Sequence, residues 1–128
     1  GPLYFPEDQL SEVNMRVIAA EIIREKVMIH TEQEVPHSIS FEIDSYRERS
    51  DSLTYIGATI FVERDSQKGI VIGKGGERIK KIGSDARAEL GEMLGTTVYL
   101  DLQVKVLKNW RSDERQMARF GYKPSKED

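Results

Sequence analysis

The chain has 128 residues, of which 38% are hydrophobic and 32% charged, and its formal net charge is −3. This length suits one domain with a single core, and the composition is typical of a globular protein with a well-charged surface. The lack of cysteine excludes disulfides, cysteine-bound zinc and thiol nucleophiles, and the chain has no run of about 18 apolar residues that could cross a membrane.

The charges are unevenly distributed along the chain. Residues 1–63 carry five Lys and Arg against twelve Asp and Glu, whereas residues 64–87 carry seven against three. Residues 88–128 are balanced, with seven of each sign. A basic strip within an acidic chain favours local binding of a polyanion.

The first predicted element is an amphipathic helix over residues 11–28, with Asp8 or Ser11 as its cap. Its apolar residues recur at steps of three and four, namely Leu10, Val13, Val17, Ile18, Ile22, Ile23 and Val27. So wide a stripe should pack on a sheet. A coiled-coil face is the alternative, although clean heptads are too few for it.

Two strands are predicted beyond Pro36. Alternation of apolar and polar residues over 39–44 and again over 54–63 is typical of half-buried strands. The polar residues 47–52 are interpreted as the connection between them. Because this link is short, the two strands should pair antiparallel.

The pattern becomes helical from Ser66, which we expect to cap a short helix that ends at Gly73. A second helix should run to about Leu94 and end at Gly95. Alternation over 97–107 then predicts a third strand, parallel to the second because two helices connect them.

The end of the chain adds a short helix capped by Ser112 and ended by Gly121, with Trp110 as a local anchor. Lys123 begins a tail. The predicted fold is therefore α+β, in the order α-β-β-α-α-β with a terminal helix.

The turn Gly73-Lys74-Gly75-Gly76 joins the two central helices and has the character of a phosphate clamp. Glycine lacks a Cβ, so the backbone can turn sharply and come close to a ligand. The free N–H groups and positive dipole of the following helix start suit an anionic group. A nucleotide-binding P-loop is excluded, because Gly69 and Gly73 are separated by three residues and Lys74 is followed by Gly75.

The string Ile-Val-Ile-Gly-Lys-Gly-Gly-Glu-Arg-Ile-Lys-Lys-Ile over 70–82 resembles the GxxG signature of KH domains. In that family the turn clamps about four backbone nucleotides of a single strand. A helix and a strand before this core match the type II arrangement. The resemblance implies that the strand after the second helix forms the opposite wall of a groove, so residues 96–100 would approach bases.

Longer segments resemble the C-terminal KH region of the Era family of bacterial GTPases, namely residues 20–26, 34–38, 62–68 and 99–106. The resemblance implies binding of single-stranded RNA, the 3′ end of 16S rRNA, during assembly of the small (30S) ribosomal subunit. It further implies a monomeric cytoplasmic protein, with peripheral association with the inner membrane as an option. The GTPase domain would be absent, so GTP and Mg would belong to that missing part, and this chain would have no cofactor and no catalysis.

The same resemblance divides the chain into three parts. Residues 11–108 would form the type II KH domain, and residues 109–128 a short C-terminal helix and tail. Residues 1–10 would be a linker from a preceding GTPase domain, or a cloning remnant at Gly1-Pro2.

The residues expected to contact RNA belong to the turn and its flanks. They are Gly73, Lys74, Gly75, Gly76, Arg78, Lys81, Ile70 and Ile72. Plainer interpretations stay open: a helix-breaking turn without a ligand, isoleucines that only fill the core, and cations that only solvate a helix.

Two other functions compete with RNA binding. A KH-like protein-interaction module would not need the basic glycine tip, so the intact Gly-Lys-Gly-Gly argues against it. An enzyme ranks last, because His30 and His37 are isolated and no carboxylate pair or third metal ligand lies near them.

Overall fold

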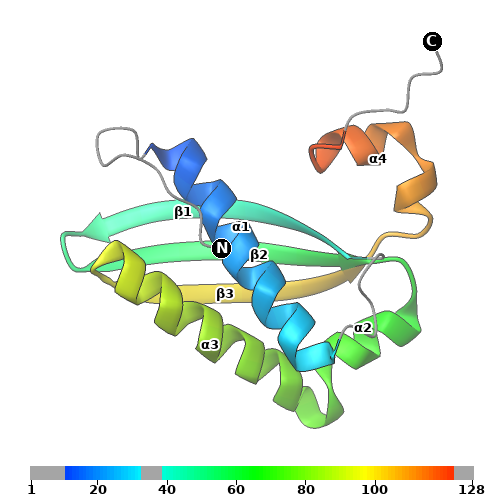
Figure 1. The fold of residues 1–128 in the computed structure, drawn as a ribbon, viewed down its shortest axis with the longest axis horizontal. Coiled ribbons are helices and arrows are strands. Elements are labelled where there is room, and N and C mark those ends of the chain that lie inside the picture. The colour runs from blue at the N-terminus through cyan, green and yellow to red at the C-terminus, as the bar shows by residue number, and fades with distance from the viewer. Residues whose placement is uncertain (1–10, 33–38, 123–128) are drawn as a thin grey trace.

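The structure is a computed structural model that describes residues 11–32 and 39–122. Its helices and strands are α1 (Glu12–Thr31), β1 (Ser40–Ser50), β2 (Leu53–Val62), α2 (Asp65–Ile72), the 3-10 turn η2 (Lys74–Gly76), α3 (Glu77–Leu94), β3 (Thr97–Val106), the 3-10 turn η3 (Trp110–Ser112) and α4 (Glu114–Arg119). The predicted order of helices and strands is confirmed (Figure 1).

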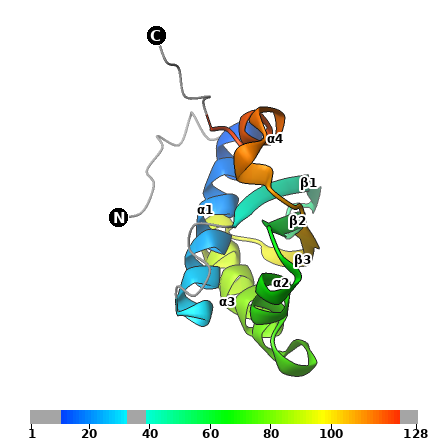
Figure 2. The same cartoon turned by 90° about the vertical axis from the view of Figure 1, so that its right-hand side faces the viewer.

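The three strands form one mixed sheet in the order β1-β2-β3. β1 and β2 pair antiparallel, and β2 and β3 pair parallel, both as predicted. Helices α1 and α3 lie on the same side of this sheet (Figure 2). We call the opposite side the open face. At one end of it Arg119 of α4 pairs with Glu42 at 2.9 Å, and the ring of Phe120, just after α4, lies 5.1 Å from that of Phe61.

The core lies between the two long helices and the sheet. Fully buried isoleucines come from each layer: Ile23 on α1, Ile60 on β2 and Ile82 on α3. Along β3 the side chains alternate, so that Val98 is buried and Tyr99 is exposed. This alternation assigns the even-numbered residues of β2 and β3 to the helix side, and the odd-numbered residues to the open face.

The first strand is longer than predicted. β1 continues to Ser50, and Arg47 pairs with Tyr55 while Glu48 pairs with Thr54. Residues 47–50 are therefore part of the hairpin and not its connection, which comprises only residues 51–52. The prediction was wrong because hydrophobic alternation records burial, and residues 47–50 are exposed on both faces although their backbone pairs.

The buried stripe of α1 also differs from the prediction. Val13 and Val17 are 70% and 49% exposed, whereas Met15 and Ala19 are buried. The helix starts where Ser11 accepts a hydrogen bond from the Asn14 N–H, and it continues three residues past the predicted end. The predicted residues Asp8 and Leu10 lie outside the described part of the chain.

Two predicted helix caps are wrong. α2 is capped at Arg64 and not Ser66, because the Gln67 side-chain oxygen accepts the N–H groups of Glu63 and Arg64, each at 2.9 Å. α4 is capped by Asp113 and not Ser112. Each helix start lies within one or two residues of the prediction, but the Gln67 and Asp113 side chains, and not those of Ser66 and Ser112, make the backbone hydrogen bonds.

The ends of α2 and α3 agree with the sequence, whereas α4 ends at Arg119, two residues before the predicted Gly121. Gly95 ends α3 with a φ of 71°, as predicted for a glycine C-cap. Trp110 is buried and lies edge-on to Phe120, with ring centroids 5.2 Å apart. It therefore anchors the terminal helix, as expected.

Candidate nucleic-acid interface

The glycine turn, residues 73–76, forms the connection between α2 and α3. The Gly73 N–H ends α2 by donating to the Gly69 carbonyl at 2.8 Å, and the Gly76 N–H donates to the Gly73 carbonyl at 3.1 Å. All three glycines of the turn have positive φ angles, 77°, 63° and 76° in chain order. Such a succession is open to glycine and strained for other residues, so the sequence dictates this turn.

The three glycines have different surroundings. A Cβ on Gly73 would lie 2.6 Å from the Arg78 Cβ, so this glycine is needed for the turn to close onto α3. A Cβ on Gly75 or Gly76 would meet no atom within 4 Å. At these two positions the bare backbone faces open space, which allows close approach by a ligand.

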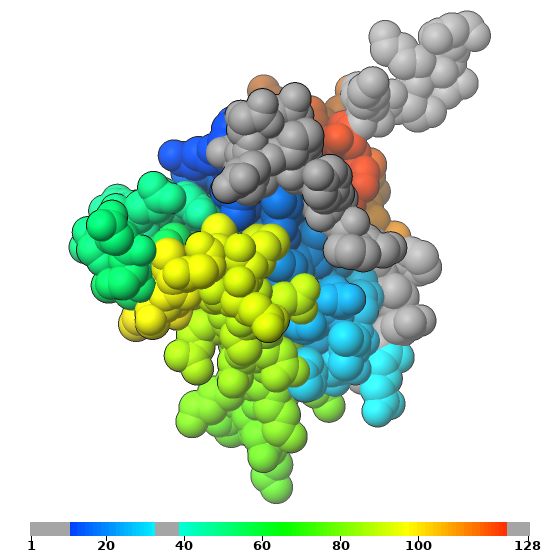
Figure 3. Space-filling model, turned by 60° about the vertical axis from the view of Figure 1, so that its left-hand side comes forward, coloured from blue at the N-terminus to red at the C-terminus, as the bar shows by residue number. Residues whose placement is uncertain are grey.

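Lys74 lies at the exposed tip of the turn. The turn projects from the lower end of the molecule in the space-filling view (Figure 3). Among the residues that the structure describes, Lys74, Lys80 and Arg87 form no ion pair with an acidic side chain. Their charges are available to an external anion.

Arg78 has a structural role in the turn. Its Nη1 donates to the Ile70 carbonyl at 2.7 Å and thereby links the start of α3 to the last turn of α2. The side chain is half-buried. The predicted contact of Arg78 with RNA stays a prediction.

A groove runs beside the turn, between α3 and the edge strand β3. It has a volume of about 420 Å³ and is lined by Ile79, Lys80, Gly83, Ser84, Arg87, Leu100, Asp101 and Leu102. A Cβ on Gly83 would lie 3.6 Å from Leu102 Cδ1, an ordinary van der Waals contact, so a side chain here would occupy part of the groove. The groove has an apolar floor and two cations on its α3 side, which suits a base below and phosphates above.

None of the eight predicted site residues lines this groove. Ile70 and Ile72 are half-buried, and Ile70 packs on the core; neither lines the groove. Lys81 lies one helical turn before Asp85, which contacts α1, so it occupies the α1 flank of α3. Of residues 96–100, which were expected to approach bases, only Leu100 lines the groove.

Several groove residues were not predicted as site residues, namely Ile79, Lys80, Gly83, Ser84, Arg87, Asp101 and Leu102. Gly83 offered a signal, since a glycine inside a helical pattern costs stability and usually has a packing reason. A second signal was that Arg87 follows Lys80 by seven residues, or about two helical turns, which places both cations on the same face of α3.

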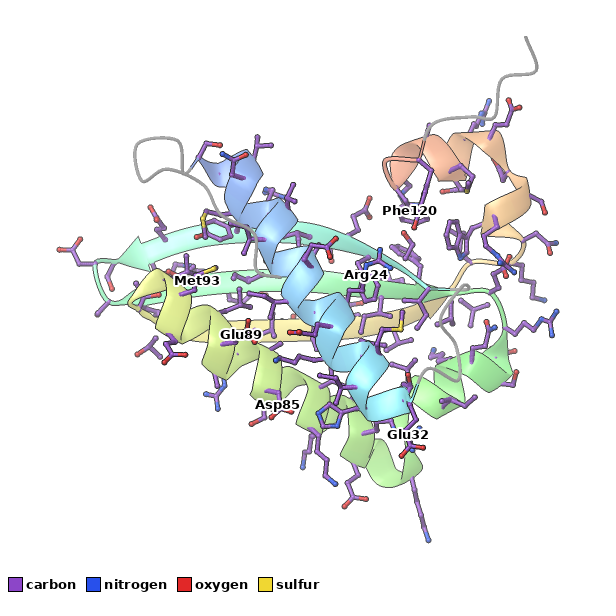
Figure 4. The ribbon with its side chains drawn as sticks, in the orientation of Figure 1. Arg24, Glu32, Asp85, Glu89, Met93 and Phe120 are labelled. Atoms are coloured by element: carbon purple, nitrogen blue, oxygen red, sulfur yellow. The ribbon has the colours of Figure 1, made fainter. Side chains whose placement is uncertain are left out.

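Two of the four acidic side chains of α3, Asp85 and Glu89, face α1. Asp85 Oδ2 is 2.6 Å from His30 Nε2, and Glu89 Oε1 is 2.7 Å from Lys26 Nζ, both on α1 (Figure 4). The hydrogen bond to Glu89 raises the pKa of Lys26, although burial opposes the shift. These pairs tie α1 to α3 and leave the groove side of α3 basic.

Within the described ranges, no group of three His, Asp or Glu side chains could hold a metal ion. No helix of the described part is long and apolar enough to span a membrane.

The sequence matches the KH domain family over residues 34–111. It is 56% identical over 123 residues to GTPase Era of Geobacter metallireducens, and 48% identical over 124 residues to GTPase Era of Mycobacterium avium. These alignments cover 95% of this chain but only 41% and 42% of the relatives. The chain thus spans about two-fifths of the length of the GTPases it matches.

Two solved structures have the same fold. One is a crystal structure of Era in complex with MgGDPNP and nucleotides 1506–1542 of 16S ribosomal RNA, with a TM-score of 0.82 and 42% identity. It matches 97% of this chain and 42% of that one. The other is a crystal structure of a point variant of Aquifex aeolicus Era bound to GDP and AlF4⁻, with a TM-score of 0.81 and 43% identity. It matches 94% of this chain and 40% of that one.

Proposed function

Because the chain belongs to the KH domain family, we propose that it binds single-stranded RNA through the glycine turn and the groove between α3 and β3. The observation that carries the proposal is the bare backbone at Gly75 and Gly76, which faces open space beside the exposed Lys74. A sugar–phosphate backbone can approach such a surface more closely than it could if these positions carried side chains.

The roles of the residues follow from their places. Phosphates lie over the glycine turn, near Lys74 and the start of α3. Bases enter the groove against Ile79 and Leu100, and Lys80 and Arg87 contact the phosphates that follow. Phosphate contacts supply affinity and its salt dependence, while contacts to base edges supply preference. The other predicted site residues support or flank this surface, namely Arg78, Lys81, Ile70 and Ile72.

The RNA that we propose is the 3′ end of 16S rRNA. One structural relative, at 42% identity, contains nucleotides 1506–1542 of that RNA. We further propose that the chain is the KH part of an Era-like GTPase in small-subunit assembly, with residues 11–108 as the domain and 1–10 as a linker. GTP, Mg and hydrolysis then belong to the remainder of that protein, and the chain itself is a monomeric cytoplasmic RNA-binding module.

A binding measurement tests this proposal. Fluorescence anisotropy would compare labelled oligonucleotides from the 3′ end of 16S rRNA with scrambled sequences of the same composition. We expect tighter binding of the native sequence, and for both a decrease in affinity with added salt because phosphates are contacted. Equal affinity for both sequences would reject the rRNA assignment, and no binding to either would reject RNA binding itself.

A further inference from the structure

A second pocket lies on the open face of the sheet, where no function has been assigned. Its lining residues come from all three strands and are Arg49, Leu53, Tyr55, Tyr99 and Asp101, around a volume of about 350 Å³. We call it the tyrosine pocket. It lies across the edge strand β3 from the groove described above.

Two stacked tyrosines form the wall of the tyrosine pocket. The rings of Tyr55 and Tyr99 have centroids 5.4 Å apart and planes inclined by only 14°. Tyr99 is nonetheless 60% exposed, so its outer ring face is free to stack on a further planar group. An exposed aromatic surface of this kind is typical of sites that bind unpaired bases.

The polar groups around the two rings favour a nucleobase over a purely apolar ligand. The Arg49 guanidinium lies 5.6 Å from the centre of the Tyr55 ring, and Arg47 is exposed on the same face. Tyr55 donates to Asp101 Oδ2 at 3.3 Å. Desolvation of the Tyr55 phenol and the nearby Asp101 charge raise its pKa above the ordinary value of 10.0. Arginine suits the phosphates beside a stacked base, and a carboxylate can accept the exocyclic amine of cytosine, adenine or guanine.

The tyrosine pocket and the groove share one lining residue at the edge of the sheet. Asp101 lines both, and it belongs to β3, which forms one edge of the sheet. An RNA strand that leaves the groove over this edge therefore reaches the open face directly, without crossing β1 or β2.

We propose that the tyrosine pocket is a second site for single-stranded RNA, which stacks a nucleobase of a strand that continues from the groove onto Tyr99. The inference rests on the proposed RNA binding and extends its footprint to the opposite face of the sheet. A ligand that fills only the groove does not use the second site.

Oligonucleotide length separates the two sites in an experiment. The five-nucleotide window of the 16S 3′ end that binds best would be compared with two longer RNAs. One carries five more native nucleotides on the 5′ side of the window, and the other carries five more on the 3′ side. Binding of all three would be measured by fluorescence anisotropy for wild type, Tyr99→Ala, Tyr99→Phe and Gln103→Ala. Gln103 is exposed on the same strand and face, outside the tyrosine pocket, and serves as the matched control.

We expect Tyr99→Ala to weaken binding of one of the two extended RNAs, the one whose extension reaches the tyrosine pocket, by roughly 5- to 150-fold, the range for one stacked base. The affinity for the short RNA should not change. Tyr99→Phe and Gln103→Ala should behave as wild type. If Tyr99→Ala leaves both extended RNAs unaffected, or weakens both lengths equally, the second site is rejected while the groove stands. If wild type binds none of these RNAs, both the proposed function and the second site are rejected. Circular dichroism would verify that the variants are folded.

Discussion

The packed helix–sheet interface and the glycine turn draw residues from the same short stretch of chain but differ in burial and in side-chain size. Ile82 on α3 is fully buried, whereas Lys74 and Gly75, only about two turns of helix earlier, are exposed. The interface is built from large apolar side chains, while the turn is built mainly from residues that lack one. We therefore expect stability to depend mainly on the buried side chains and binding mainly on the exposed turn.

The largest effect on the packed side should come from Ile82→Ala. Removing this buried side chain should lower the free energy of unfolding by about 2–5 kcal/mol, because it leaves a cavity among α1, α3 and the sheet. Urea denaturation measures the loss. The control is Ile29→Ala on α1, where the side chain is 59% exposed and the change should be about 0.5 kcal/mol or less. Similar losses for the two variants would contradict the assigned core.

Gly73 lies at the border between the two regions and sharpens the comparison. Gly73→Ala should cost about 1–3 kcal/mol, because a Cβ would clash with Arg78 at a φ of 77°. Gly69→Ala, inside α2 with no atom near its Cβ, should instead stabilise the chain by about 0.5–1 kcal/mol. Thermal unfolding of the two variants would show shifts of opposite sign. A neutral Gly73→Ala would mean that the turn is not closed as described.

On the binding side, Lys80→Ala combined with Arg87→Ala should weaken RNA binding and leave unfolding unchanged. Each lost phosphate contact should reduce the slope of log affinity against log salt by about 0.7. Anisotropy titrations at several salt concentrations give this slope. Lys105→Ala, an exposed lysine on the open face outside both pockets, is the control. An unchanged slope in the double variant would remove these cations from the interface.

The smallest expected effect lies on the packed side and depends on pH. The Glu89 contact raises the pKa of Lys26 above its ordinary value of 10.5. Since the folded pKa exceeds the unfolded one, the stabilisation is complete below pH 10.5 and is lost as the pH rises through the folded pKa. Lys26→Met should lack this contribution, so that its stability approaches that of wild type in alkali. A constant difference in unfolding free energy between pH 7 and about pH 11 would contradict this account.

The sequence predicted the fold wherever burial imposed a period. The alternation in β2 and β3 and the stripe of α3 contain enough apolar residues to define which side of each element is buried. β1 beyond Ile43 could not be predicted in this way, because its paired residues 47–50 are exposed and their side chains are free to be polar. The caps at Arg64 and Asp113 depend on which of several neighbouring polar side chains reaches the backbone, which is decided by geometry.

The glycine turn was predictable for a similar reason, since a cluster of glycines has few uses other than positive φ and close approach. The groove was less so. Its α3 residues 79, 80, 83, 84 and 87 do follow a helical spacing, but they mix apolar, glycine, polar and basic types. Nothing local in the sequence shows that three successive residues of β3 lie beside them. The tyrosine pocket could not be predicted either, because only the pairing of β2 with β3 brings Tyr55 beside Tyr99, and Arg49 joins them from an irregularity in the pairing of β1 with β2.

The most direct test of the central claim is RNA binding by the double variant Lys74→Asp/Gly75→Asp. Its control, Ser112→Asp/Arg115→Asp, makes the same change in net charge near the start of α4, remote from the turn in Figure 1. Anisotropy with the 16S 3′-end oligonucleotide should show binding abolished in the turn variant and retained in the control. Both should give a wild-type circular dichroism spectrum, and only the turn variant should lose some stability, because Gly75 has a φ of 63°. A folded turn variant that binds as tightly as wild type would show that the glycine turn is not the RNA clamp.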